Sequence, residues 1–125
     1  MGLSNEVIFY GEANDQELQW LYQNAIALIL PSLMEGFGLP ALEAMACGCL
    51  VLASDIPALR EVCEEAALYF NPRSEEEIRK KLYESYMAYE TYESYIKKGL
   101  KRAKMFSWQK MAEETLRVYQ KVMRK

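Results

Sequence analysis

The sequence predicts an α/β fold, in which a Rossmann-like parallel sheet of about four strands with helices is followed by a C-terminal helical segment. Up to about residue 73, short apolar runs alternate with helical patterns, and such alternation is typical of parallel sheets with right-handed crossovers. From Ser74 onward the pattern is helical only. Hydrophobic residues make up 51% of the 125 residues, which is ample for the core of one domain spanning residues 1–125.

Four short runs are predicted to form the strands. Residues 7–10 are β-branched and aromatic and are followed by Gly11. Residues 25–30 are continuously apolar, as expected for a strand that is covered on both faces. Residues 50–53 are predicted to form the next strand and residues 67–70 the last one.

Capping residues mark the helices between these strands. Asn14 and Glu17 have the spacing of a capping box at the start of the first helix. Pro40 suits the first turn of the second helix, because the missing N–H costs nothing there, and Gly48 follows its end. Pro57 begins a short third helix.

The C-terminal segment is predicted to begin with a second capping box, formed by Ser74 and Glu77. Its helices are expected over residues 75–88, 92–104 and 108–123. Tyrosines recur at every third residue across the first junction: Tyr83, Tyr86, Tyr89, Tyr92 and Tyr95. A strict three-residue step would wind around an α-helix, so we expect a helix break near residue 90 rather than a binding stripe.

Composition argues against several classes of function. The net charge of −3 comes from interleaved acidic and basic residues, so nucleic acid is not an expected partner. No stretch is long and apolar enough to span a bilayer, and the first residues lack the pattern of a signal peptide. The chain contains no histidine, which excludes Ser-His-Asp and Cys-His nucleophile systems and histidine-based metal sites.

The three cysteines, Cys47, Cys49 and Cys63, are odd in number and lie in apolar or helical surroundings. Three thiols without a histidine make a poor zinc site. Structural thiols in a reducing cytoplasm are therefore favoured over disulfides. We expect a cytoplasmic protein that needs no metal and no cofactor.

The segment from Pro31 to Gly48 is the most informative part of the sequence. A Gly-Phe-Gly turn joins two carboxylates, Glu35 and Glu43, and opens a helix. Helix N-termini present unpaired N–H groups that attract phosphate. A carboxylate one or two turns further on can accept hydrogen bonds from sugar hydroxyls. This combination predicts binding of a sugar-nucleotide diphosphate rather than a plain phosphate.

This segment resembles the Glu-x7-Glu signature of retaining GT-B glycosyltransferases of the group 1 or family 4 type. The flanking residues 50–57, Glu61 with Val62, and residues 106–108 also stand where that family has them, so the resemblance covers nearly the whole chain. It implies transfer of a hexosyl group from a nucleotide diphosphate sugar to an acceptor hydroxyl. Residues 1–73 would be the nucleotide-sugar-binding part and residues 74–125 the C-terminal helices.

The resemblance also implies roles for individual residues. Glu35 is the candidate catalytic residue, in contact with the donor sugar and not acting as a general base. Glu43 would bind the ribose hydroxyls. The donor diphosphate would lie against the backbone of the turn formed by Gly36, Phe37, Gly38 and Leu39.

Each of these residues also has a simpler interpretation. The two glycines could merely form a loop, and Glu43 could be a surface helix residue. Phe37 could stack on a donor group, although packing onto the core is favoured. Ser54 and Asp55 could border the donor crevice or cap the helix that begins at Pro57.

By resemblance, the chain corresponds to the latter part of the second GT-B domain. Two preceding strands, an Arg/Lys pair that neutralises the donor phosphates, and the acceptor-side domain are not found in this sequence. We therefore expect no catalysis by the chain alone, and an N-terminal glycosyltransferase half is a possible partner. The alternative function is a non-catalytic α/β association module that retains the signature.

The predicted sheet has an apolar edge at residues 25–30. Native proteins usually cover such an edge. Residues 7–10 could move over to pair with it, which would give a compact four-stranded sheet. We favour instead a homodimer with this edge near the interface.

Overall fold

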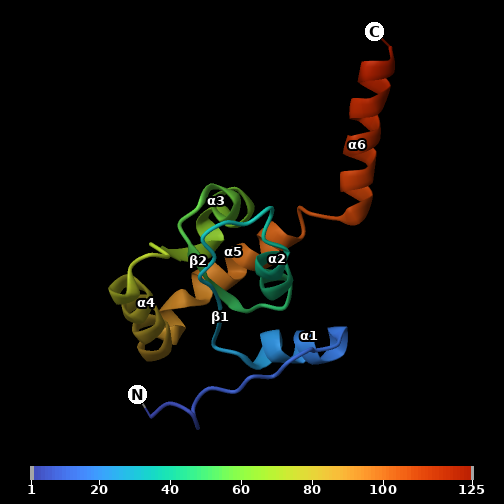
Figure 1. Cartoon of the computed structure of the whole chain (residues 1–125). Helices are drawn as coiled ribbons and strands as arrows, with labels where there is room; N and C mark the ends of the chain where they lie inside the picture. Colours follow the sequence, from blue (N-terminus) through green and yellow to red (C-terminus); the bar gives the residue numbers. More distant parts are fainter. Residues whose placement is uncertain (1, 125) are drawn as a thin grey trace.

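The computed structural model describes residues 2–124, so Met1 and Lys125, the ends of the predicted single domain, lie outside the described residues. Its centre is a parallel sheet in the order β1-β2-β3 (Figure 1). The strands are β1 (Ala27–Leu30), β2 (Leu50–Ser54) and β3 (Ala67–Phe70). The predicted α/β class and its parallel sheet are confirmed.

The strand predicted over residues 7–10 is wrong. These residues have no regular secondary structure, and Phe9 is 95% exposed. A β-branched and aromatic composition favours a strand only when a neighbouring strand accepts the backbone hydrogen bonds. No described residue pairs with this segment, so it neither becomes the fourth strand nor pairs with the edge at β1.

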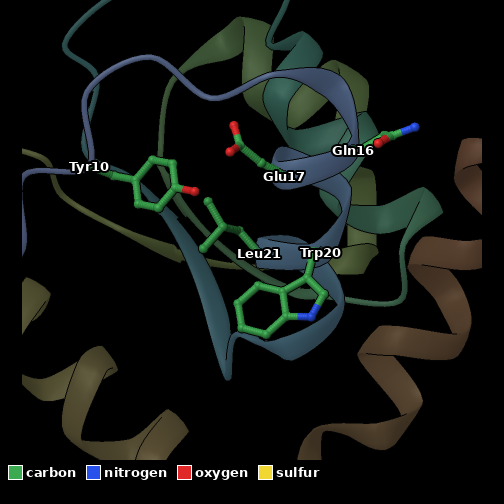
Figure 2. A pocket seen from close by; sticks show the side chains of 5 residues that line it. All are labelled: Tyr10, Gln16, Glu17, Trp20 and Leu21. Carbon is green, nitrogen blue, oxygen red and sulfur yellow. The ribbon is translucent and has the colours of Figure 1, made fainter.

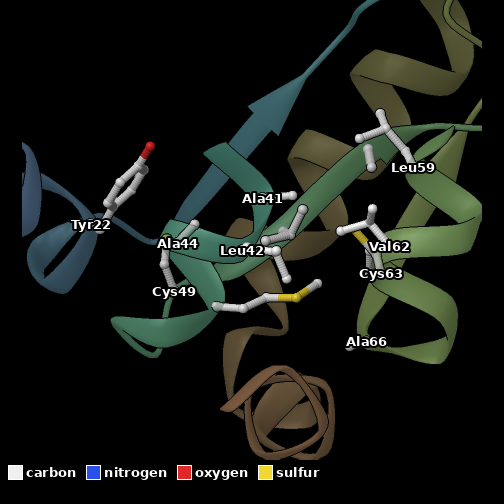
Figure 3. Close-up of a cluster of buried hydrophobic side chains, with 13 residues drawn as sticks. Tyr22, Ala41, Leu42, Ala44, Cys49, Leu59, Val62, Cys63 and Ala66 are labelled. Atoms are coloured by element: carbon white, nitrogen blue, oxygen red, sulfur yellow. The ribbon is translucent and has the colours of Figure 1, made fainter. Parts of the chain in front are cut away.

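Helices cover both faces of the sheet. One face packs against α1 (Asp15–Asn24), α2 (Leu39–Ala46) and α3 (Pro57–Cys63). Figure 3 shows the buried side chains of this face. Val51 and Ala53 belong to it, whereas their neighbours Leu50 and Leu52 point to the opposite face, as the two-residue period of a strand requires.

The opposite face packs against α4 (Glu75–Met87) and the start of α5 (Glu93–Ala103). A 3₁₀ turn, Tyr89–Tyr92, separates these two helices and confirms the predicted break in the tyrosine pattern. A second 3₁₀ turn, Glu64–Ala66, leads from α3 into β3.

Helix α5 is held against α2 and α3 by contacts that the sequence pattern does not predict. A Cβ on Gly99 would lie 3.0 Å from Cγ of Met45, so this glycine lets the two helices approach closely. Arg102 donates from Nε to the carbonyl oxygen of Val62 and from Nη2 to that of Glu61, both at 2.8 Å. These bonds satisfy carbonyl groups near the end of α3.

The predicted caps are confirmed in part. At α1, Asn14 and Glu17 each accept a hydrogen bond from the other's backbone N–H, at 3.0 and 2.9 Å, so the capping box is complete. At α4, Ser74 accepts from the N–H of Glu77. The Glu77 carboxylate, however, accepts from the N–H of Asn71 at 2.7 Å, because it reaches one turn further back.

Helix α6 (Trp108–Met123) begins where the sequence predicts, with Ser107 as its cap, and extends away from the sheet (Figure 1). All of its residues are exposed. They include an apolar series: Trp108, Met111, Leu116, Val118, Tyr119, Val122 and Met123. Within residues 2–124, no helix is both long enough and apolar enough to cross a membrane.

Candidate functional site

The predicted signature occupies the turn from β1 into α2, at the carboxyl end of the sheet. Open α/β sheets bind ligands at that end of their strands. Gly38 is the N-cap of α2 and has a left-handed backbone with φ of 99°. The N–H of Ala41 donates to its carbonyl oxygen at 3.0 Å, which starts the helix. Pro40 lies in the first turn, as predicted.

The fold requires a glycine at only one of the two glycine positions of the turn. A Cβ on Gly38 would lie 2.6 Å from Cδ2 of Leu59, a buried residue of α3. Conformation and packing both exclude a larger residue there. A Cβ on Gly36 would meet nothing within 4 Å, and its φ is not positive. The described fold therefore gives no reason for a glycine at position 36.

Backbone donors gather at this turn. No hydrogen bond within residues 2–124 uses the N–H groups of Gly36, Phe37, Gly38 or Leu39. The helix macrodipole adds a partial positive charge at the same place. The turn can therefore accept an anion through several backbone N–H groups.

Each carboxylate of the signature accepts a hydrogen bond from one hydroxyl. Ser32 donates from Oγ to Oε1 of Glu35 at 2.7 Å, within the same loop. Tyr22, on α1, donates from its hydroxyl to Oε2 of Glu43 at 3.3 Å. Glu35 is half-buried and Glu43 is exposed on α2. In both cases the second carboxylate oxygen has no partner among residues 2–124.

Neither hydroxyl was predicted as part of the site. Ser32 follows the proline that ends the strand, and a serine there is ordinary loop chemistry. Tyr22 recurs with Leu18 and Leu21 on one face of the first helix, and this spacing indicates packing rather than a role in the site. The available signal was the polar tip of a tyrosine on that face, because a buried phenol needs a hydrogen-bond partner.

Phe37 packs on another aromatic side chain. Its ring meets that of Phe106 edge to face, with centroids 5.9 Å apart. Phe106 is in turn covered by the guanidinium of Arg102 at 4.8 Å. The loop is thereby fixed to the segment that follows α5, while the Phe37 side chain stays partly exposed.

Ser54 and Asp55 do not cap α3. Its N-cap is Ile56, which makes no side-chain cap bond. Ser54 instead donates from Oγ to the carbonyl oxygen of Leu30 at 3.0 Å, which ties β2 to β1. Asp55 forms a two-bond ion pair with Arg60, and these bonds hold the pKa of Asp55 below its usual value.

Two open cavities lie elsewhere on the surface. One, of about 340 Å³, has Asp55, Arg60 and Tyr69 in its lining, with the Arg60 guanidinium 3.7 Å from the Tyr69 ring centre. The other, of about 290 Å³, lies between α1 and the preceding segment (Figure 2). Its lining consists of Tyr10, Gln16, Glu17, Trp20 and Leu21. Neither cavity is lined by Glu43 or by any of residues 35–39, although Asp55, a candidate for the border of the donor crevice, lines the first one.

The signature segment, residues 31–48, contains no lysine or arginine. None precedes Arg60 in the sequence, and Arg60 is already paired with Asp55. Among the described residues, no group of three acidic, cysteine or histidine side chains could hold a metal ion. Burial raises the pKa of Cys63 to about 11, and the pKa of Cys49 is also raised chiefly by burial, so both remain neutral thiols.

The fold and the turn define a class first: α/β proteins that present a helix N-terminus and flanking carboxylates at the carboxyl end of a parallel sheet. The profile of the family described as "Glycosyl transferases group 1" matches residues 1–102. The chain belongs to this family. It corresponds to part of the C-terminal domain of the GT-B fold, as the resemblance implied.

Individual relatives agree with this assignment. The chain is 36% identical over 111 residues to "O-antigen chain mannosyltransferase B" of Escherichia coli, covering 89% of this chain and 29% of the relative. It is 36% identical over 125 residues to "MMP alpha-(1->4)-mannosyltransferase" of Mycolicibacterium hassiacum, covering 97% of this chain and 30% of the relative.

The structure is similar to that of sucrose-phosphate synthase from Thermosynechococcus elongatus, with a TM-score of 0.86 and 28% sequence identity. This match covers 97% of the present chain and 31% of the synthase. The chain thus spans less than a third of the length of each of these three proteins.

Proposed function

We propose that this chain binds the nucleotide diphosphate sugar donor of a retaining hexosyltransferase, which passes the hexosyl group to an acceptor hydroxyl. One observation carries the proposal. Four backbone N–H groups, at residues 36–39, have no partner among residues 2–124, and they stand in the sequence between two carboxylates that are each already held by a hydroxyl. A diphosphate supplies the acceptor oxygens that such N–H groups lack.

The two carboxylates then have different roles. Glu35 contacts the transferred sugar, and Glu43 accepts the ribose hydroxyls. A hydrogen bond from a hydroxyl to a carboxylate contributes roughly 1.5–3 kcal/mol before desolvation losses. Gly36 leaves space for the phosphate to approach the backbone closely, which accounts for a glycine where the fold itself needs none. The mannosyltransferase names of several relatives favour a mannosyl donor.

Catalysis needs cationic side chains, and residues 31–46 contain none. Departure of a diphosphate is normally stabilised by preorganised cations, and no lysine or arginine precedes Arg60. The chain alone therefore has no transferase activity. An N-terminal glycosyltransferase half, in the cytoplasm, would complete the enzyme. Turnover of a nucleotide sugar by the purified chain without an added partner would contradict this proposal.

Calorimetric titration with guanosine and uridine diphosphates tests the donor site directly. Glu43→Gln is expected to weaken binding about tenfold or more, because a neutral amide is a poorer acceptor for the ribose hydroxyls. Glu61→Gln is the matched control, since Glu61 is an exposed glutamate on α3. Equal affinities for the two variants, or a nucleotide bound along residues 83–95, would contradict the site.

A specific observation supports the second candidate function, a non-catalytic association module. The outer edge of β1 has no strand neighbour among the described residues, and α6 leaves its apolar series uncovered. We propose a homodimer of the isolated chain with β1 or its covering helices near the interface. Light scattering should show a dimer at micromolar concentration. A monomer whose amide exchange does not change on dilution would contradict it.

A further inference from the structure

Tyr22 connects α1 to the candidate ribose-binding carboxylate. It is 8% exposed and lies at the margin of the apolar cluster between α1 and α2 (Figure 3). Its hydroxyl reaches Oε2 of Glu43, a residue 21 positions away in the sequence. This is the side-chain hydrogen bond that joins the two helices among the described residues.

The position of Tyr22 is fixed by its own helix. The complete capping box at Asn14 fixes the start of α1. Leu18, one turn before Tyr22, packs against the same apolar cluster. The ring is therefore anchored, and the carboxylate of Glu43, on an exposed and flexible side chain, is the part that gains order from the bond.

The hydrogen bond has a defined direction. Burial, followed by the nearby Glu43 carboxylate, raises the pKa of Tyr22 to about 12. The phenol therefore stays protonated at physiological pH and donates, while the carboxylate accepts. The 3.3 Å separation is at the long end for such a bond, and bonds of this kind often tighten only when a ligand occupies the site.

We propose that Tyr22 is a positioning residue, which holds Glu43 by one carboxylate oxygen and leaves the other oxygen aimed at the ribose of the donor nucleotide. This inference rests on the proposed function, because it assigns Glu43 to the ribose. It goes further by naming the group that sets the orientation of Glu43. The hydroxyl of Tyr22 does not touch the nucleotide in this scheme.

The test measures binding of guanosine and uridine diphosphates and of their 2′,3′-dideoxy counterparts to the full chain by calorimetry. Tyr22→Phe removes only the hydroxyl. It is expected to lower the affinity for the ribonucleotides about three- to tenfold, the effect of one lost hydrogen bond. The affinity for the dideoxy nucleotides should stay unchanged. Tyr69→Phe is the matched control, because the Tyr69 hydroxyl donates to the carbonyl oxygen of Glu64, outside the signature.

The outcomes separate the two proposals. If Glu43→Gln weakens ribonucleotide binding but Tyr22→Phe does not, the donor site is supported and the positioning role of Tyr22 is overturned. Equal weakening of ribonucleotides and dideoxy nucleotides by Tyr22→Phe would mean a general structural effect and would also overturn it. If Glu43→Gln has no effect, the ribose role of Glu43 itself fails.

A measurement without nucleotide covers the case of weak affinity. Side-chain scalar couplings from nuclear magnetic resonance report whether Glu43 occupies one rotamer or several. Glu43 is expected to occupy one dominant rotamer in the wild type and in Tyr69→Phe. In Tyr22→Phe its couplings should be averaged over several rotamers. Couplings that are the same in all three proteins would overturn the proposal.

Discussion

The loop of residues 31–38 and helix α2 each present one carboxylate of the signature, but they support it in different ways. Glu35 is held by Ser32, three residues earlier in the same loop. Glu43 is held by Tyr22, which lies on another helix. One half of the candidate site is therefore built locally, whereas the other half depends on the packing of α1 against α2.

The same contrast applies to the two glycines. Gly38 is fixed by tertiary structure, because its left-handed backbone and its contact with Leu59 both exclude a side chain. Gly36 has neither constraint. Substitutions at these positions therefore separate what the fold requires from what a ligand would require.

The largest expected effect comes from Gly38→Ala. A left-handed alanine and its collision with Leu59 together should lower the free energy of unfolding by about 2–4 kcal/mol. Denaturant unfolding measures this change. Gly36→Ala is the control and should stay within about 0.5 kcal/mol of the wild type, while weakening binding of nucleoside diphosphates. Similar stabilities of the two variants would mean that the fold does not require a glycine at position 38 more than at position 36.

Asn14→Ala tests how far Glu43, on α2, depends on the stability of α1, which carries Tyr22. Loss of the cap should cost about 1 kcal/mol of stability and loosen α1, which carries Tyr22. Thermal unfolding and amide exchange in α1 report the two effects. Ser107→Ala is a useful comparison, because Ser107 caps α6, an exposed helix that supports no residue of the site. If Asn14→Ala changed amide exchange in α6 rather than in α1, Asn14 would not be the residue that stabilises α1.

Ser32→Ala tests the local support of Glu35. Loss of one hydroxyl donor should reduce the binding free energy of a nucleotide sugar by about 0.5–1.5 kcal/mol. Binding of the matching nucleoside diphosphate should be unaffected, because Glu35 is assigned to the sugar. Calorimetry with both ligands measures the difference. Equal losses for the two ligands would instead place Ser32 or Glu35 against the diphosphate.

The smallest expected change is in the titration of Tyr22. Burial is the larger cause of its raised pKa and the Glu43 charge the smaller one, so Glu43→Gln should lower the pKa while leaving it above the usual 10. Because the folded pKa is the higher one, this group's contribution to stability is complete below pH 10 and is lost as the pH rises toward 12. Ultraviolet titration, with Tyr22→Phe as reference, measures the shift. An unchanged pKa would mean that Glu43 does not interact with the phenol.

Much of the fold could be predicted from the sequence, because the signals are local. The apolar runs at residues 50–53 and 67–70 lie within strands, and the break in the tyrosine pattern falls at the 3₁₀ turn. The site turn was predicted in the same way, from a Gly-Phe-Gly sequence that opens a helix and a proline in the first turn of α2.

The failures share a physical cause. Residues 7–10 have strand composition but no neighbouring strand among the described residues, and strand formation is a property of a pair. The apolar side chains of α6 could likewise form a buried helix face, yet they are exposed and no described element covers them. Composition and period describe what a segment could bury, and only its neighbours decide whether it does.

The sequence by itself therefore determined the α/β class, the glycosyltransferase signature, and the Gly-Phe-Gly turn that leads into α2. Tertiary structure decided the strand count, the close approach of α5 to α2 at Gly99, and the contact of Tyr22 with Glu43. The reason is the range of the interactions. Caps, turns and periodic faces depend on residues a few positions apart, whereas edges, helix contacts and side-chain pairs depend on which segments the folded chain brings together.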